Sequence, residues 1–192
     1  MKLCLYGASS NLIDKKYIDA TEKLGEEMAK RGHTLVFGGG ANGLMGAAAR
    51  GATKAGGEII GISPKFFDVD AVLYDKCTEF IYTETMQERK HLLVTKSDGF
   101  IVMPGGPGTF DELFETLSLR QLGIHNKPIA VFNIDGYFDP LGQMLKNAYD
   151  GKFMTKEILE LCPLFNNETD LLKYLEENAN GTGDFSVLKA LK

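Results

Sequence analysis

Apolar and polar residues alternate along this chain in two patterns that predict strands and helices in turn. Short apolar runs predict β-strands at residues 2–6, 34–37, 58–62, 79–82, 99–103 and 128–133, with a weaker one at 163–166. The segment after the first run is predicted to be a helix. Its apolar side chains recur three or four residues apart, at Ile13, Tyr17, Ala20, Leu24 and Met28. Further helices are expected at 43–55, 86–96, 110–122, 140–149, 156–161 and 168–178.

The order of these elements predicts the fold class. Strands that alternate with helices are typical of an α/β fold in which helices cover both faces of a parallel sheet. No linker or repeat divides residues 1–180, which we expect to form one domain, and residues 181–192 are expected to form a C-terminal tail. In such a sheet, ligands bind beyond the carboxyl ends of the strands, where the chain order reverses. The residues that follow each strand are therefore the candidates for function.

Composition narrows the classes of protein to consider. The net charge is −5 and no run of Lys and Arg occurs, which argues against extended nucleic-acid binding. No apolar stretch approaches the ~18 residues of a membrane span, and the start of the chain does not resemble a signal peptide. The three cysteines are far apart and none belongs to a CxxC motif, so we expect no disulfide framework and a cytoplasmic location. The three histidines are isolated, which argues against a structural metal site.

Three of the predicted strand ends run into glycine-rich loops, at residues 7–10, 38–43 and 105–108. One such loop could be an ordinary tight turn, but three at the same edge indicate backbone amides that lie close to a ligand. The loop at 38–43 matches GxGxxG, yet the next strand does not end in the acidic residue that a dinucleotide site requires. The Gly-Lys-Ser/Thr ending of an ATPase phosphate loop is also absent, because Thr109 follows Gly108.

The third loop leads into a predicted helix and presents two carboxylates there. Thr109 and Glu112 have the spacing of a capping box, a purely structural role. The glycines before them expose several amides at the start of a helix, where a phosphate binds favourably. A carboxylate about 4 Å from that phosphate would be repelled by about 4 kcal/mol at an effective dielectric constant near 20. Asp111 or Glu112 should then point away from the phosphate, toward another part of the ligand or a cation. We favour Glu112 as the chemical group and Asp111 as a solvated or capping residue.

A second helix start places two cations where the helix dipole disfavours them. Thr85 and Glu88 have capping-box spacing, and Arg89 and Lys90 follow in the first turn. Either the two cations are solvated at a small cost, or an anion or a carboxylate nearby compensates for their position. The sequence position leaves both interpretations open.

Four motifs together resemble the LONELY GUY (LOG) family of cytokinin riboside 5′-monophosphate phosphoribohydrolases, long labelled lysine decarboxylases. Residues 104–112 match the family signature PGGxGTxxE at every fixed position, and Met86 precedes Arg89-Lys90 as in the second signature. Residues 43–46, Gly-Leu-Met-Gly, and residues 121–128 also match. The similarity extends from about residue 2 to about residue 153, which is most of the chain.

The resemblance implies a Rossmann-like, doubly wound and mainly parallel sheet of about seven strands, and a homodimer or a larger assembly of dimers. It also implies hydrolysis of the N-glycosidic bond of a purine 5′-monophosphate, of adenosine or N6-modified adenosine, to free base and ribose 5-phosphate, without metal or cofactor. Arg89 and Glu112 would be the catalytic pair. The residues expected to bind the substrate or its phosphate are Lys90, Gly105, Gly106, Pro107, Gly108, Thr109, Gly39, Gly43, Met45 and Ser9.

Departures from the plant-type pattern leave the base open. Gln87 stands where plant members usually have His, and Leu119 where they tend to have Trp. Residues 66–76 do not align cleanly with the acidic segment that contacts the ribose in plant members. A modified adenine nucleotide, plain AMP and another purine monophosphate are all compatible with these differences. A non-catalytic nucleotide-binding or carrier module is the alternative function, whereas literal lysine decarboxylation would require a Schiff-base lysine for pyridoxal phosphate, and no convincing one is found.

Overall fold

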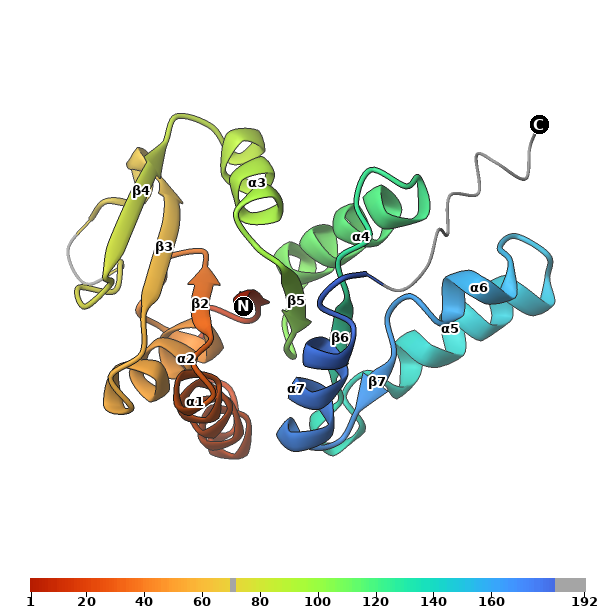
Figure 1. Ribbon diagram of the computed structural model, residues 1–192, viewed down its shortest axis with the longest axis horizontal. Coiled ribbons are helices and arrows are strands. Elements are labelled where there is room, and N and C mark those ends of the chain that lie inside the picture. The colour runs from red at the N-terminus through yellow and green to blue at the C-terminus, as the bar shows by residue number, and fades with distance from the viewer. Residues whose placement is uncertain (70–71, 182–192) are drawn as a thin grey trace.

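A computed structural model describes residues 1–69 and 72–181, built around one seven-stranded sheet (Figure 1). The predicted tail, apart from Gly181, lies outside the described residues. The strands are β1 (Lys2–Tyr6), β2 (Thr34–Phe37), β3 (Ile59–Pro64), β4 (Glu79–Thr83), β5 (Gly99–Val102), β6 (Ile129–Phe132) and β7 (Leu164–Phe165). The helices are α1 (Lys15–Lys30), α2 (Gly43–Lys54), α3 (Met86–Thr95), α4 (Pro107–Gln121), α5 (Asp139–Asp150), α6 (Lys156–Leu159) and α7 (Glu168–Glu177), with 3-10 turns η1 (Lys65–Phe67) and η2 (Ile134–Gly136).

The sheet is parallel throughout and its two faces are covered by different helices. Side chains of β1 alternate, so that Leu3 and Leu5 join one core while Cys4 and Tyr6 join the other. The first core includes α1, α2 and α7, and the second includes α3, α4 and α5 (Figure 1). Strands buried on both faces read as continuous apolar runs, which is why most of them could be found in the sequence.

The order of the strands, β4-β3-β2-β1-β5-β6-β7, confirms the predicted doubly wound α/β fold. From β1 the chain proceeds outward to β4 and then returns to the other side of β1 at β5, so the order reverses between these two neighbours. Their carboxyl ends carry two of the three glycine-rich loops. The amide of Ala8, in the loop after β1, donates to the carbonyl of Pro104, which directly precedes the loop at residues 105–108, over 3.1 Å. The fold thus brings both loops to the edge where ligands bind in this class.

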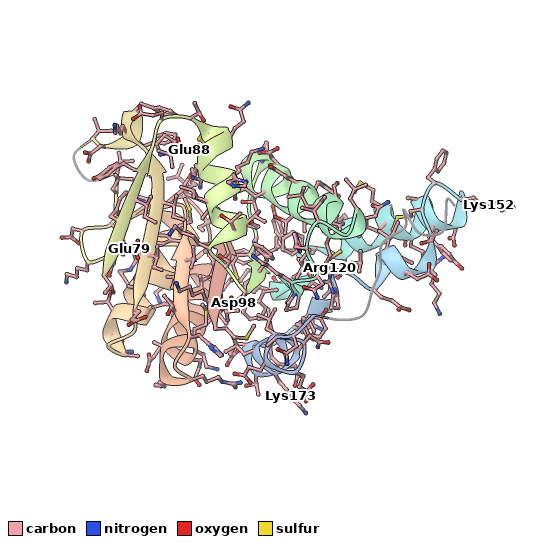
Figure 2. The ribbon with its side chains drawn as sticks, turned by 45° about the horizontal axis from the view of Figure 1, so that its top comes forward. Glu79, Glu88, Asp98, Arg120, Lys152 and Lys173 are labelled. Atoms are coloured by element: carbon pink, nitrogen blue, oxygen red, sulfur yellow. The ribbon has the colours of Figure 1, made fainter. Side chains whose placement is uncertain are left out.

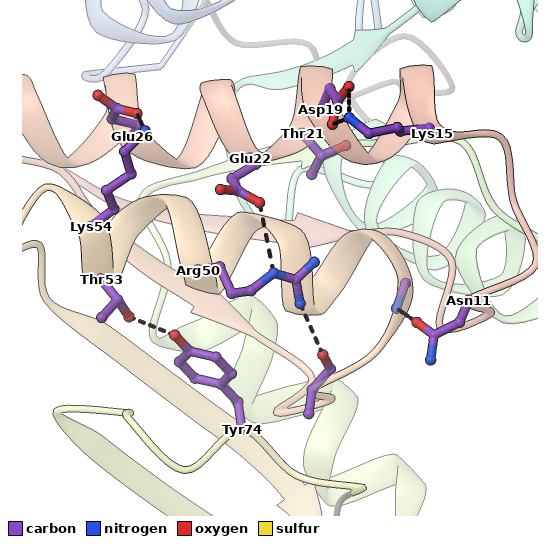
Figure 3. A network of polar contacts seen from close by, with 12 residues as sticks. Asn11, Lys15, Asp19, Thr21, Glu22, Glu26, Arg50, Thr53, Lys54 and Tyr74 are labelled. Carbon is purple, nitrogen blue, oxygen red and sulfur yellow. Dashed lines mark hydrogen bonds and ion pairs between the residues drawn. The ribbon is translucent and has the colours of Figure 1, made fainter.

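Close packing of α1 against α2 sets the position of the glycine-rich loop at residues 38–43, which precedes α2. A Cβ on Gly25 would lie 2.2 Å from the carbonyl oxygen of Ala48, and one on Gly51 would lie 1.9 Å from that of Glu22. Only glycine permits such an approach. Figure 3 shows Arg50 of α2 linked to Glu22 of α1, with its Nε 3.7 Å from the Glu22 carboxylate. The Nη1 of Arg50 donates to the carbonyl of Ala41 over 3.3 Å. The loop that precedes α2 is thereby attached to the helix pair.

A buried arginine holds α4 against the segment that follows α6. Arg120 of α4 is 2% exposed, and its Nη1 donates to the carbonyl of Leu161 over 2.6 Å (Figure 2). This contact ties α4 to the segment after α6. Lys152, labelled beyond α5 in Figure 2, has a φ of 61° at the turn between α5 and α6. In residues 1–69 and 72–181, no helix is both long enough and apolar enough to cross a membrane.

Candidate active site

A cavity of about 560 Å³ opens at the carboxyl edge of the sheet. Its volume is within the range of about 300–1,000 Å³ that is typical of small-molecule sites. The loops after β1, β2 and β5 contribute to its wall, together with α3 and the start of α4. The polar and glycine residues among these are Gly7, Ser9, Gly38, Gly40, Asn42, Arg89, Gly106, Gly108, Thr109, Asp111 and Glu112. The reversal of strand order thus coincides with the cavity.

Arg89 and Glu112 form an ion pair in this wall. Arg89 Nη1 lies 2.8 Å from Glu112 Oε1, and the two side chains are 9% and 12% exposed. Of the two interpretations left open by the sequence, the structure supports compensation of Arg89 by a nearby carboxylate. A Cβ on Gly38 would lie 2.0 Å from Arg89 Nη2, so the absence of a side chain there makes room for the guanidinium.

Burial and the guanidinium act in opposite directions on Glu112. Burial disfavours the charged carboxylate and raises its pKa, while the charge and the hydrogen bond of Arg89 lower it. Burial prevails, and the pKa of Glu112 is raised above its usual value of 4.5. Such a group exchanges protons at a higher pH than an exposed glutamate does. A carboxylate with this property in a cavity can serve as a general base.

The start of α4 corrects the predicted capping box. The helix begins at Pro107, three residues earlier than predicted, with Gly106 at the cap position. Glu112 therefore lies in the second turn of α4, where it pairs with Arg89. Because Gly106 and not Thr109 is the cap residue, Glu112 does not occupy the capping-box position. Among the described residues, no side chain caps this helix start. Its first amides remain available to an anion, as is typical of phosphate sites.

The glycines of the loop before α4, at residues 105–108, have two different functions. A Cβ on Gly105 would lie 2.1 Å from Thr109 Oγ1 and 3.1 Å from the amide of Ala8, so Gly105 is required by close packing. A Cβ on Gly106 or Gly108 would meet no protein atom within 4 Å, and both residues line the cavity. The open side of these two glycines faces space that a ligand can enter.

Lys90 lies away from the cavity, unlike its neighbour Arg89. Its Nζ lies 3.0 Å from Asp111 Oδ2 and 2.5 Å from Glu115 Oε2, and these charges raise the pKa of Lys90, with Glu115 as the main cause. It is not part of the cavity wall, where the family resemblance would place it. Asp111, the carboxylate expected to be solvated or capping, is 59% exposed and pairs with Lys90 at the rim.

The remaining predicted binding residues divide between the wall and its support. Ser9, Met45, Pro107 and Thr109 line the cavity. Gly39 and Gly43 do not; they have φ values of 79° and 58°, which favour glycine, and they shape the loop between β2 and α2. Each has a backbone role rather than a place in the wall.

Sequence reasoning missed the apolar part of the wall. Phe67, Val72, Leu73 and Met86 line the cavity together with Ser63. Phe67 and Met86 are 42% and 40% exposed although they are large and apolar. Two signals in the sequence pointed to this region: residues 66–76 did not align with plant members, and Met86 belongs to the second family signature. An antiparallel bridge between Gly40 and Leu73, which no local pattern predicts, brings this segment over the loop after β2.

The second predicted capping box is present with one change. Thr85 Oγ1 accepts from the amide of Glu88 over 3.1 Å, as predicted, but Glu88 Oε2 accepts from the amide of Glu84 rather than from that of Thr85. Within residues 1–69 and 72–181, no group of three or more His, Cys, Asp or Glu side chains is arranged to hold a metal ion.

This chain is similar to known proteins over most of its length. A family model described as "Possible lysine decarboxylase" matches residues 45–175. The cytokinin riboside 5′-monophosphate phosphoribohydrolase LOG2 of Arabidopsis thaliana is 34% identical over 184 residues, which cover 96% of this chain and 86% of that protein. The cytokinin riboside 5′-monophosphate phosphoribohydrolase LOG of Oryza sativa subsp. japonica is 34% identical over 92% of this chain and 73% of that protein.

Solved structures with the same fold include proteins with another described role. A molybdenum cofactor binding protein from Rippkaea orientalis has a TM-score of 0.70 and 22% identity, over 92% of this chain and 96% of that one. A molybdenum cofactor carrier protein from Chlamydomonas reinhardtii has a TM-score of 0.70 and 20% identity, over 92% of this chain and 98% of that one. At these identities the likeness shows the fold alone.

Proposed function

We propose that this chain, which belongs to the LONELY GUY (LOG) family of cytokinin riboside 5′-monophosphate phosphoribohydrolases, hydrolyses the N-glycosidic bond of a purine nucleoside 5′-monophosphate. The products are the free base and ribose 5-phosphate. The observation that carries the proposal is the buried pair of Arg89 and Glu112 in the cavity wall, beside an uncapped helix start. A protein that only binds a nucleotide has little use for the Glu112 carboxylate beside the site proposed for the phosphate.

In the proposed mechanism the 5′-phosphate binds at the start of α4, on the amides of Gly106, Gly108 and Thr109. Cleavage of the bond between C1′ and the purine nitrogen sends its electron pair into the base and builds positive charge on the ribose. Glu112 stabilises that charge and takes a proton from the attacking water, whose oxygen bonds to C1′. The departing base receives a proton from solvent. Arg89 orients the Glu112 carboxylate and opposes the effect of burial on its pKa.

The shape of the cavity supports placing the base at its apolar end. Phe67, Val72, Leu73 and Met86 lie in this part of the wall, and apolar side chains suit the faces of a purine. Adenosine 5′-monophosphate and its N6-modified forms are the proposed substrates. A panel of nucleoside 5′-monophosphates with and without N6-substituents, assayed by chromatography for free base, identifies the preferred one.

The test of the proposed reaction compares three variants on AMP. Arg89→Ala and Glu112→Gln should each abolish release of adenine while circular dichroism and thermal unfolding show an intact fold. Glu115→Gln is the matched control, because Glu115 also lies on α4 and pairs with a cation of α3 but not in the cavity wall. It should keep its activity. Full activity of Glu112→Gln would refute the role given to Glu112.

The same experiment separates hydrolysis from binding alone. Saturable AMP binding by the unaltered chain, with no adenine released from any substrate of the panel, would favour a nucleotide-binding or carrier module. The homodimer or larger assembly of dimers implied by the family is a further part of the proposal, and sedimentation measures it directly.

A further inference from the structure

We infer that Tyr137 is a positioning residue that orients the phosphate-binding loop by holding the peptide between Gly105 and Gly106. This inference rests on the proposed binding of a 5′-phosphate at the start of α4. The Tyr137 hydroxyl donates a hydrogen bond of 2.6 Å to the carbonyl oxygen of Gly105. Tyr137 follows η2, after β6, so the contact joins two loops that are 32 residues apart in the chain.

Peptide geometry explains how a contact outside the cavity can act inside it. The carbonyl of Gly105 and the N–H of Gly106 belong to one planar trans peptide, so they point in opposite directions. A carbonyl fixed toward Tyr137 therefore directs the Gly106 N–H to the other side. Gly106 lines the cavity and occupies the cap position of α4. Its amide is one of the donors that the phosphate requires.

This peptide needs an external anchor because both of its residues are glycine. Neither residue has a side chain that would resist rotation of the peptide about its flanking bonds. A Cβ on Gly106 would meet nothing within 4 Å, which indicates open space on that side of the loop. The preceding peptide has its own anchor, since the carbonyl of Pro104 accepts from Ala8. Two successive carbonyls are thus held, and the Tyr137 hydroxyl holds the one next to the helix start.

Tyr137 is itself well placed to serve as an anchor. Its ring packs edge-on against those of Tyr17 and Phe138, at centroid distances of 6.2 and 5.0 Å. Its amide donates to the carbonyl of Ile134 within a tight turn in which Asp135 has a φ of 53°. These contacts fix the ring independently of the hydroxyl. Removal of the hydroxyl alone should leave the turn intact.

The test is Tyr137→Phe, with Tyr149→Phe as the matched control. Both tyrosines are 39% exposed, and Tyr149 belongs to α5 and is not part of the cavity wall. We expect Tyr137→Phe to lower kcat/KM for AMP about tenfold, mainly through KM, while kcat/KM for adenosine, which lacks the phosphate, changes less than twofold. A tenfold change corresponds to about 1.4 kcal/mol, within the range for one hydrogen bond. Thermal unfolding of both variants should match that of the unaltered chain.

Each outcome decides the inference. Equal losses for AMP and adenosine, or no loss for AMP, overturn it. If the unaltered chain hydrolyses AMP alone, or neither compound, calorimetric binding of AMP and adenosine replaces the kinetic comparison. An AMP dissociation constant raised about tenfold in Tyr137→Phe, with that of adenosine unchanged, then supports the anchor, even where neither compound is hydrolysed and the hydrolase proposal has failed. An unchanged AMP constant, or no AMP binding by the unaltered chain, overturns the anchor as well.

Discussion

Gly38→Ala tests whether the room left for the Arg89 guanidinium matters to activity. The new Cβ would lie 2.0 Å from Arg89 Nη2, whereas ordinary van der Waals contact begins near 3.4 Å. The guanidinium would have to retreat by about 1.4 Å, the difference between these distances. A shift of that size would break the 2.8 Å contact between Arg89 Nη1 and Glu112 Oε1. A misplacement of about 1 Å at a catalytic group can cost about 10²-fold in rate, or about 2.7 kcal/mol, and we expect a loss of this size in kcat.

The pH profile gives an independent readout of the same change. Arg89 lowers the pKa of Glu112 against the larger effect of burial, so loss of the contact should raise that pKa further. If the ionised carboxylate is the active form, the acidic limb of the activity profile should move to higher pH. Gly142→Ala in α5 is the matched control, because its new Cβ would lie 3.8 Å from Leu164 Cδ2, an ordinary contact. It should leave both activity and the profile unchanged.

A double-mutant cycle, measured by thermal unfolding, tests directly whether Gly38 acts through Arg89. The obstructing atom is the end of a flexible side chain, so Gly38→Ala should lower the midpoint of thermal unfolding only slightly. In the Arg89→Ala background the clash is absent, and Gly38→Ala should there be neutral or stabilising by about 0.4–1 kcal/mol. Equal destabilisation in both backgrounds, or an unshifted acidic limb, would show that Gly38 does not act through Arg89.

Two further predictions concern the folded framework. Gly51→Ala should lower the free energy of unfolding in urea by about 1–3 kcal/mol, because its Cβ would lie 1.9 Å from the backbone oxygen of Glu22 and must push α1 and α2 apart; a loss no greater than that of Gly142→Ala would contradict this packing. Glu176 lies 2.9 Å from His33 Nε2 and 3.3 Å from Arg31 Nη1; burial tends to raise its pKa, but these partners prevail and lower it below 4.5. Its ionised form therefore stabilises the fold above pH 4.5, and this contribution is lost as the pH falls through the lower pKa of the folded state. Glu176→Gln should make the free energy of unfolding fall less steeply as the pH drops through that acidic window. An unchanged decline would show that the contacts of Glu176 with His33 and Arg31 do not contribute to acid stability.

The sequence by itself determined the local elements and the motif that forms the site. Strands buried on both faces, such as β2, β3, β5 and β6, leave continuous apolar runs. The partly exposed β4 was predicted one residue too short, and the two-residue β7 lay within its predicted range. Thr85 was identified as a cap because its hydroxyl and the amide it serves are three residues apart. Glycines after three strands indicated a ligand edge before any strand order was known. These features depend on residues close together in the chain.

Only the tertiary structure decided which neighbours face each other. Arg89 and Lys90 are adjacent, but successive side chains on a helix point about 100° apart, so the packing of α3 directs one to Glu112 and the other to Asp111 and Glu115. The contact of Tyr137 with Gly105 joins loops that the strand order brings together. Such contacts depend on sheet order and helix orientation, which long-range packing sets and no local pattern of residues records.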